Sequence, residues 1–470
     1  MFKFLKFKKT AKDADAVTPD KTDFDSFIAK SVEAITNNDD IDDELFKKHD
    51  VKRGLRNANG TGVVVGLTHI GDVVGYDTNE KGEKVAVEGK LYYRGYDVLD
   101  LVDNYLAEDR RGFEETTYLL LFGKLPNKEQ LAEFTELLST KRELPVGFNR
   151  DIIMTVPSAN VMTQLARSVL AMYTYDRAPE DTSILNVLRQ SIELISCFPT
   201  LMAYAYQSKK AYFDNESMHI HNPSAELCTA ENILRMIRPT GEFTSLEAKL
   251  LDICLVLHAE HGGGNNSSFA THLLSSTGTD TYSVIAAAIG SLKGPKHGGA
   301  NQSVLQMVDD IKRNVKDITD YNEVEQYLIK ILKGEANDKS GLIYGLGHAV
   351  YTVSDPRTAV LKRMANELAL DKGLMDEFML YDFIEKRAPE LNQEMTGSAK
   401  PLPANADLYS GFVYSALNIP MDIATPLFAT ARLSGWCAHR IEELIAGKRL
   451  IRPAYICIQP PLEYTPLEGR

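Results

Sequence analysis

The stretch "SILNVLRQSIELISCFPTLMAYAYQSKK", residues 183–210, decides the fold class of this chain. It is rich in residues that favour helices, and its apolar side chains recur at intervals of three and four. That period places them on one face of an α-helix, whereas a half-buried strand would show strict alternation. The stretch therefore predicts a long helix.

Helical signals of the same kind dominate the rest of the chain. Two earlier runs, 61–76 and 83–93, are instead rich in β-branched residues and are separated by glycine and charge, which favours strands. Strands and helices do not alternate, and no repeat of fixed period occurs. We therefore predict an all-α fold with a small β patch near the N-terminus. The other predicted helical segments are 113–126, 160–176, 245–261, 280–294, 301–314, 322–335, 355–370, 374–393 and 423–447.

Length and charge limit the classes of function. The chain has 470 residues, which exceeds what one hydrophobic core usually serves, so two or more domains are expected. Its formal net charge of −13 argues against nucleic acid as the main partner. An anionic substrate must therefore be bound by a local cluster of arginines, against the overall field.

The N-terminus and the cysteines indicate a cytoplasmic protein. The start, "MFKFLKFKKTAK", has lysines too often for a secretory signal and no arginine for a mitochondrial one. No apolar run is long enough to span a bilayer, so no membrane association is expected. Residues 11–50 are strongly acidic and predict a loosely docked extension. Five widely spaced cysteines without a CxxC motif fit reduced thiols, most of them buried.

Glycine-rich breaks separate several of the predicted helices, at 262–264, 294–299, 341–347 and 396–405. Three of these four breaks have a histidine within them or beside them. Functional side chains are often held on loops between rigid elements. The breaks therefore predict a site assembled from loops at helix ends.

His258 and His261 precede the first of these breaks in "LHAEHGGGNNSS". Their spacing of three puts them on one helical face, and paired histidines can ligate zinc. The HExxH order is absent, however, and no carboxylate or cysteine follows at ligand spacing. Capping and core histidines at a helix end are the favoured interpretation, and no metal site is expected.

His297 lies in the second break, "GPKHGGAN", just before a predicted helix. The positive end of the helix dipole disfavours an imidazolium at this position. A neutral imidazole near a helix end can donate a hydrogen bond to a developing oxyanion. A glycine turn with a capping histidine is the structural alternative.

Further histidine, arginine and aspartate candidates follow in the C-terminal half. His348 follows a glycine loop, and Arg357 follows Asp-Pro in the first turn of a predicted helix, where a cation is not placed for the dipole. Asp407 lies among small and apolar residues ahead of a helical run, and Arg432 lies in an apolar helix. With Arg452, which precedes a proline, these arginines suggest a carboxylate-binding cluster, since guanidinium pairs bidentately with carboxylates. Internal ion pairs are the alternative.

Taken together, these segments resemble the citrate synthase family from about residue 54 to about residue 460. Each motif alone is weak, but all of them occur in the family's order. The resemblance implies a large helical domain over 51–292 and 411–470, a small helical domain over 293–410, and a 1–50 extension without a counterpart. The motifs are "GKLYYRGYDVLDL", "FEETTYLLLFGKLP", "AENILRM", "LHAEHGGGNNSSFATH", "GPKHGGANQSVL", "GLGHAVYTVSDPR", "NADLYSG" and "LFATARLSGWCAH".

The resemblance also implies an activity, the Claisen-type condensation of acetyl-CoA with oxaloacetate, followed by thioester hydrolysis to citrate and CoA in the tricarboxylic acid cycle. Asp407 would take a methyl proton from acetyl-CoA, and His297 would donate to the thioester oxygen. His348 would polarise the oxaloacetate carbonyl. No cofactor is implied, because the CoA thioester is a substrate.

Oxaloacetate binding is implied for His261, Arg357, Arg432 and Arg452. In the family the arginine that matches Arg452 comes from the other subunit, so a homodimer is the expected unit. Closure of the small domain on the large one is expected as well. Thr352 departs from the pattern, because many members have Lys or Arg there to hold a CoA phosphate.

Three alternatives stay open at this stage. A 2-methylcitrate synthase would use propionyl-CoA, and one methylene in a pocket changes discrimination only modestly. A zinc hydrolase would use His258, His261 and His272. A non-catalytic helical scaffold would keep the fold without turnover.

Overall fold

The computed structural model describes residues 24–57, 59–80, 83–397 and 401–469, and the chain forms two compact units, Met1–Val65 and Gly66–Arg470. The basic start, residues 1–12, lies outside the described residues. In the first unit, helices α1 (Phe24–Asp39) and α2 (Asp43–Lys48) precede a short 3-10 turn, η1 (Arg53–Leu55). The acidic composition of this region did not reveal these helices.

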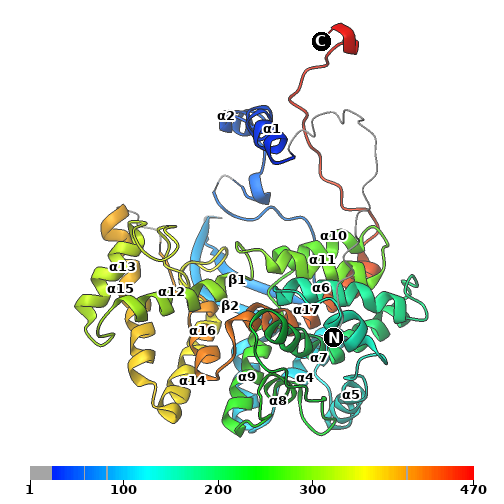
Figure 1. The fold of residues 1–470 in the computed structure, drawn as a ribbon, viewed down its shortest axis with the longest axis vertical. Helices are drawn as coiled ribbons and strands as arrows, with labels where there is room; N and C mark the ends of the chain where they lie inside the picture. The colour runs from blue at the N-terminus through cyan, green and yellow to red at the C-terminus, as the bar shows by residue number, and fades with distance from the viewer. Residues whose placement is uncertain (1–23, 58, 81–82, 398–400, 470) are drawn as a thin grey trace, which may run out of the picture. The chain divides into compact units, whose positions relative to one another are not determined.

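The second unit is mainly helical, which confirms the predicted fold class (Figure 1). Its strands are β1 (Gly71–Thr78), β2 (Lys84–Tyr93) and β3 (Tyr96–Asp97). Its α-helices are α3 (Val98–Ala107), α4 (Phe113–Phe122), α5 (Lys128–Thr140), α6 (Val161–Met172), α7 (Ile184–Phe213), α8 (Thr229–Ile237), α9 (Ser245–His258), α10 (Asn266–Ser275), α11 (Thr281–Lys293), α12 (Ala300–Asn314), α13 (Tyr321–Leu332), α14 (Pro356–Lys372), α15 (Met375–Thr396), α16 (Ala406–Ala416) and α17 (Ala424–Ala446). Short helical turns are η2 (Asn149–Met154), η3 (Tyr173–Tyr175), η4 (Met421–Ile423) and η5 (Leu467–Gly469).

Helix α7 is the long helix that residues 183–210 predict. It begins after Ser183, whose side chain accepts a hydrogen bond from the backbone of Asn186, as a good N-cap does. Pro199 lies inside it, and the helix continues past it although a proline removes one backbone hydrogen bond. Most residues between Asn186 and Ser208 are buried, because α6, α8 and α17 all contact this helix. Tertiary packing therefore offsets the local cost of the proline.

The predicted β patch forms only in part. Strands β1 and β2 pair antiparallel from Gly71 with Tyr93 to Thr78 with Lys84, and β3 adds to β2. Residues 61–70 were predicted to belong to this patch, but they form no strand apart from one isolated bridge at Gly62. Val64 and Leu67 are strongly exposed. Residues 61–70 are rich in β-branched side chains, but no described strand pairs with them. A strand needs such a partner for stability.

The β1–β2 hairpin packs closely against the segment that leads into α14. A Cβ at Gly75 would lie 2.5 Å from the carbonyl oxygen of Val350, and a Cβ at Gly89 would lie 2.1 Å from that of Ser354. Glycine is therefore required at both positions for this close approach. The hairpin supports the loop between His348 and Arg357 from one side.

Helices α12, α13, α14, α15 and α16 contact one another and gather on one side of the second unit (Figure 1). They lie within the predicted small domain, 293–410, except for the end of α16. A single connected apolar core nevertheless runs from Ile70 to Ile441 and includes side chains of these helices. The domain boundaries at 293 and 410 stay a prediction.

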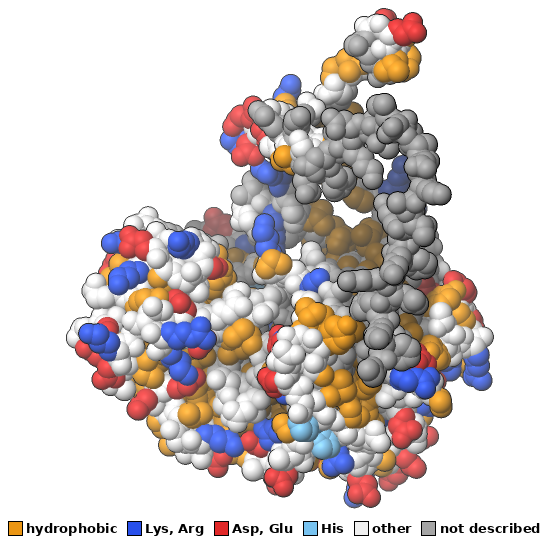
Figure 2. Space-filling model, viewed as in Figure 1, with side chains coloured by type: hydrophobic (Ala, Val, Ile, Leu, Met, Phe, Trp, Pro, Cys, Tyr) orange, Lys and Arg blue, Asp and Glu red, His pale blue; other side chains and the backbone are white. Residues whose placement is uncertain are grey.

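The surface charges, the apolar character of the helices and the state of the cysteines can be compared with what the composition predicted. On the face shown in Figure 2, Lys and Arg side chains alternate with Asp and Glu over the α12–α15 side. Among the described helices, none has the length and apolar character needed to cross a membrane. All five cysteines are free; Cys197, Cys254 and Cys437 are buried, whereas Cys457 is exposed.

Candidate active site

The predicted site residues lie at helix ends and in the loops between helices, as the glycine-rich breaks predicted. The exceptions are Arg432, which lies in the middle of α17, and Arg452, which lies in the extended segment after it. Asp407 is the second residue of α16, and Arg357 is the second residue of α14. His261, His297 and His348 lie in the loops that follow α9, follow α11 and precede α14.

His261 and His348 meet directly, although 87 residues separate them in the chain. Their Nε2 atoms are 3.1 Å apart, and the His348 ring stacks on Tyr351 with ring centroids 4.5 Å apart. Burial, followed by the nearby Arg357 and His348, holds the pKa of His261 well below its usual value. His261 is therefore neutral in this arrangement.

The backbone fixes the tautomer of His348. Its Nδ1 accepts hydrogen bonds from the backbone N–H groups of Val350 and Tyr351, both at 3.1 Å. A neutral imidazole has one N–H, so the hydrogen lies on Nε2 and is donated to His261 Nε2. A carbonyl oxygen that replaced His261 as the acceptor would be polarised by the same N–H.

His297 is a neutral histidine held by a serine. Its Nε2 lies 3.1 Å from Ser267 Oγ, which also accepts the indole N–H of Trp436 at 3.0 Å. The Ser267 hydroxyl has one hydrogen, which it donates either to Nε2 or to Asn265 Oδ1, 2.9 Å away. Donation to Nε2 leaves the imidazole hydrogen on Nδ1, where it is available to a ligand. Burial, with a smaller effect of Arg432, lowers the pKa of His297 to about 4.

We expect His297 to stay neutral from pH 8 down to about pH 5, because its pKa is lowered to about 4. Nitrogen-15 NMR of the imidazole rings measures this directly, and the His297→Gln variant assigns the signal. The unfolded chain protonates this residue near its ordinary pKa of about 6.5, so its effect on stability is a loss as the pH falls from about 6.5 to about 4. A cationic His297 in the free protein at pH 7 would contradict the assignment.

Arg357 forms a buried ion pair with Asp355. Its Nε and Nη2 atoms donate to the two carboxylate oxygens of Asp355 at 3.0 and 2.7 Å. Asp355 also caps α14, through the backbone N–H of Arg357, as its place before Pro356 predicts. Burial opposes the charge of Asp355, but Arg357 holds the pKa of this carboxyl below its usual value. The ion-pair alternative for Arg357 is thus present, and one edge of its guanidinium, formed by Nε and Nη2, is already occupied.

Arg432 is fully buried and has no ion pair among the described residues. Its Nε donates to the carbonyl oxygen of His258 at 2.6 Å, and its guanidinium lies 4.8 Å from the centroid of the Phe428 ring. Both Nη atoms are buried, and no described residue forms a hydrogen bond with them. Burial lowers its pKa to about 10, so it stays cationic at pH 7. A buried cation with two unused donors is a binding group for an anion.

Asp407 is a carboxylate with a raised pKa near these cations. Its backbone N–H is held by the cap residue Asn405 at 3.0 Å. Burial raises the pKa of Asp407 to about 6, and Arg357 and Arg432 moderate that rise. A carboxylate that titrates near neutral pH can act as a general base.

Two sequence expectations concern residues outside this cluster. Arg452 is exposed in the C-terminal segment, and the structure of the single chain does not bring it to the other site residues. Thr352 is partly buried, and its hydroxyl has no partner among the described residues. Among the described residues, neither side chain forms a hydrogen bond or an ion pair with the other site residues.

The histidines of the zinc alternative do not converge. The His258 ring lies against Phe428, with centroids 4.4 Å apart, and its buried nitrogens have no hydrogen-bond partner among residues 24–57, 59–80, 83–397 and 401–469. Burial, followed by nearby arginines, lowers its pKa well below the usual value, so it is a neutral core histidine. His261 faces His348, whereas His272 faces His439 at 3.0 Å. The proposed set His258, His261 and His272 was therefore wrong as a metal site.

Sequence reasoning missed Ser267, Asp355 as the partner of Arg357, and the His258 carbonyl as the support of Arg432. In the sequence, Asp355 was noted only for its place before Pro356, which predicts a helix cap. Ser267 lies in "GGGNNSS" without a distinguishing pattern, and a backbone carbonyl has no sequence signal at all. These supports depend on contacts between distant segments.

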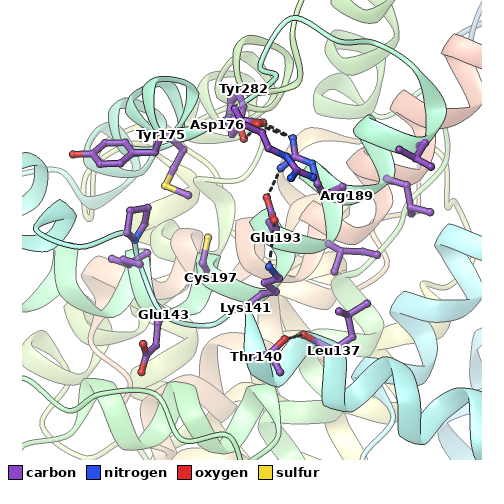
Figure 3. Close-up of a pocket in the computed structure, with 17 residues that line it drawn as sticks. Leu137, Thr140, Lys141, Glu143, Tyr175, Asp176, Arg189, Glu193, Cys197 and Tyr282 are labelled. Atoms are coloured by element: carbon purple, nitrogen blue, oxygen red, sulfur yellow. Dashed lines mark hydrogen bonds and ion pairs between the residues drawn. The ribbon is translucent and has the colours of Figure 1, made fainter.

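A separate cavity of about 800 Å³ lies between α5, α6 and α7 and contains none of the predicted site residues (Figure 3). Two of the three cations that line it, Lys141 and Arg189, are already paired: Arg189 binds Asp176 and Glu193, and Lys141 lies 3.5 Å from Glu193. Such groups offer little free charge to a ligand. We therefore locate the chemistry at the histidine–arginine–aspartate cluster.

Several known proteins are similar to this chain in sequence and in fold. The citrate synthase of Deinococcus radiodurans is 38% identical over 349 residues, which cover 73% of this chain and 85% of that protein. The 2-methylcitrate synthase of Shewanella oneidensis is 31% identical over 379 residues, 80% of this chain and 91% of that protein. The structure of Thermoplasma acidophilum citrate synthase, a ternary complex with carboxymethyl coenzyme A and oxaloacetate, has a TM-score of 0.72 at 26% identity and covers 89% of this chain and 99% of that chain. The family model "Citrate synthase, C-terminal domain" matches residues 58–454, and this chain belongs to the citrate synthase family.

Proposed function

We propose that this chain is an acyltransferase that converts the acyl group into an alkyl group: it condenses acetyl-CoA with oxaloacetate and hydrolyses the product to citrate and CoA. The observation that carries the proposal is the proximity of Arg432, a buried cation with unused donors, to Asp407, whose pKa is raised to about 6. The Arg432 cation can bind a carboxylate of the oxaloacetate dianion. The methyl group of the thioester is weakly acidic, so removing its proton needs a base such as Asp407. The free thiols support a cytoplasmic location.

Proton removal is the first chemical step. Asp407 takes a proton from the acetyl methyl group, and the thioester oxygen gains negative charge. His297 donates its Nδ1–H to that oxygen while Ser267 holds Nε2. A neutral donor stabilises the developing charge without pairing with Asp407 in the ground state.

Carbon–carbon bond formation follows. The enolate carbon attacks the oxaloacetate carbonyl, and His348 Nε2–H stabilises the oxygen that becomes the hydroxyl group. As that oxygen takes the proton from Nε2, the proton that Asp407 removed restores the imidazole. Arg432, with Arg357 and His261, holds the carboxylates. Water then cleaves the thioester C–S bond, and the products are citrate, the CoA thiol and a proton. We propose that closure of 293–410 over the site delays this hydrolysis until condensation is complete.

We also propose a homodimer in which Arg452 acts in the site of the other subunit. Its exposed position in an extended C-terminal segment supports this, because the segment leaves the arginine available to a second copy. Mixing two inactive variants, Asp407→Asn and Arg452→Ala, is expected to restore activity in mixed dimers, which contain one intact site. Thiol release after co-refolding measures it. Two variants that never complement each other would argue for sites built within one chain.

The acyl donor decides between two functions. We expect thiol release from acetyl-CoA with oxaloacetate to exceed that from propionyl-CoA, and a reversed preference would make the chain a 2-methylcitrate synthase. The similarity to the 2-methylcitrate synthase of Shewanella oneidensis is the reason for testing propionyl-CoA. The control omits oxaloacetate, and acetyl-CoA alone should release no thiol. If neither thioester is consumed, the proposal fails and the scaffold alternative gains support.

A further inference from the structure

Three metal-ligand side chains converge behind the active-site loop, on α10 and α17, which contact each other. They are His272, His439 and Glu442, and one ligand atom of each lies within 4.8 Å of the others. None of them belongs to the proposed catalytic machinery. His439 is fully buried, and His272 is partly buried.

Two carboxylates determine where these histidines keep their hydrogens. His272 Nδ1 lies 2.8 Å from Glu443 Oε2, and His439 Nε2 lies 3.0 Å from Glu260 Oε1. Ionised carboxylates only accept, so each ring directs an N–H to that side, and a ring with one hydrogen has its lone pair on the other nitrogen. His272 Nε2 and His439 Nδ1, which face each other at 3.0 Å, are then both lone-pair acceptors.

Glu442 adds a third acceptor to the same space. Its Oε2 lies 3.9 Å from His439 Nδ1 and is buried without a hydrogen-bond partner in the part of the chain that the structure describes. Its Oε1 is held by the backbone N–H of His69 at 2.8 Å, which fixes the carboxylate. Three acceptors without a donor between them call for a cation.

The other histidine pair of the protein provides a contrast. His261 and His348 are separated by a similar 3.1 Å, but there backbone N–H groups occupy His348 Nδ1, and Nε2–H is the donor. That pair is complete as a hydrogen bond. The pair of His272 and His439 is not, unless a proton or a metal ion is added.

We propose that His272, His439 and Glu442 bind one Zn²⁺ ion. Zinc prefers imidazole nitrogen and carboxylate oxygen ligands, and tetrahedral ligands at its usual bond lengths lie roughly 3.3 Å apart, close to the observed 3.0 Å. Glu443 and Glu260 provide the carboxylate behind each histidine that zinc sites commonly have. A Cβ at Gly263 would lie 3.5 Å from His272 Nε2, so the glycine leaves space for a further ligand such as water.

The position of Glu260 gives the ion a structural role. One carboxylate oxygen of Glu260 receives hydrogen bonds from His439 and from the backbone N–H of Gly262. Glu260 and Gly262 are the two residues that flank His261 in the chain. An ion on His439 would fix this carboxylate and thereby the loop that holds His261. The site thus positions a binding residue and takes no part in the chemistry, and it is independent of the proposed function.

Calorimetric titration of the metal-stripped full-length chain with Zn²⁺ tests the proposal. We expect one ion per chain and a higher melting temperature. His272→Gln and Glu442→Gln each remove a ligand, and both should weaken binding by at least about tenfold. His221→Gln is the matched control, because that histidine bonds to the Pro239 carbonyl away from the cluster. His261→Asn tests whether zinc instead occupies the catalytic histidine pair.

Three outcomes would overturn the site. They are no zinc binding by the wild type, unchanged binding by His272→Gln, and loss of binding in His261→Asn alone. If a ligand variant fails to fold, zinc-edge X-ray absorption of the loaded wild type still decides. Two imidazoles and an oxygen donor around zinc are expected, and a sulfur ligand would exclude this cluster. A shared proton between His272 and His439 in a protein that binds no zinc would identify the proton as the cation.

Discussion

Replacing Asp407 by asparagine is expected to lower kcat roughly 10³-fold, because general base catalysis by one positioned side chain contributes about 10²- to 10⁴-fold. The amide has the size of the carboxylate but cannot take the methyl proton. Thiol release from acetyl-CoA at saturating oxaloacetate measures the loss. The shift in melting temperature caused by oxaloacetate alone should remain, since Arg432 and Arg357 are unchanged.

Asp376→Asn is the matched control, because Asp376 is also the second residue of a helix, α15, but is exposed. It should leave kcat unchanged. The wild-type rate gives a second reading. Asp407 must be ionised to act, so kcat/KM should fall about tenfold per pH unit below its pKa of about 6 and level off above it. If the Asp407→Asn variant keeps a kcat near that of the wild type, Asp407 is not the catalytic base.

Replacing Arg432 by methionine is expected to lower kcat/KM for oxaloacetate roughly 10³-fold, since two charge-assisted hydrogen bonds are lost at about 1.5–3 kcal/mol each. The same substitution should not lower the free energy of unfolding, although it lowers the activity. The guanidinium is buried without an ion pair among the described residues, so its removal relieves a desolvation cost. Chemical unfolding without ligand should show a free energy of unfolding that is level or higher.

Arg357→Met provides the comparison, because it replaces the same residue type at similar burial. It leaves the buried carboxylate of Asp355 without its partner, and breaking such a pair costs about 3–5 kcal/mol. The two variants should therefore both lose oxaloacetate binding but differ clearly in unfolding free energy. Equal destabilisation of both would mean that Arg432 has a structural partner and is not held ready for a ligand.

The helices and the locations of the site residues could be read from the sequence. Residues 183–210 became α7, and the Asp-Pro-Arg run became the capped start of α14, because period and capping are local properties. Residues 61–70 failed as a strand for the opposite reason. A strand needs a partner, and β-branched composition does not supply one.

The chemical state of each site residue was harder to predict. The neutral state of His297 was expected from the helix dipole, but the larger cause in the structure is burial. Ser267 contacts the ring, and Trp436 donates to Ser267. The zinc alternative failed because spacing along one helix does not show which ring faces which. The acceptors that do converge, on α10 and α17, are about 170 residues apart in the chain.

The sequence by itself determined the helical class, the family and the side chains that bear the chemistry, because these depend on residue type and order along the chain. The tertiary structure alone decided that Arg357 has an ion pair while Arg432 has none within the described segments, and that His348 donates from Nε2. It also showed that His272 and His439 face each other as acceptors. Burial and hydrogen-bond partners set charge and tautomer, and both arise only when distant segments pack together.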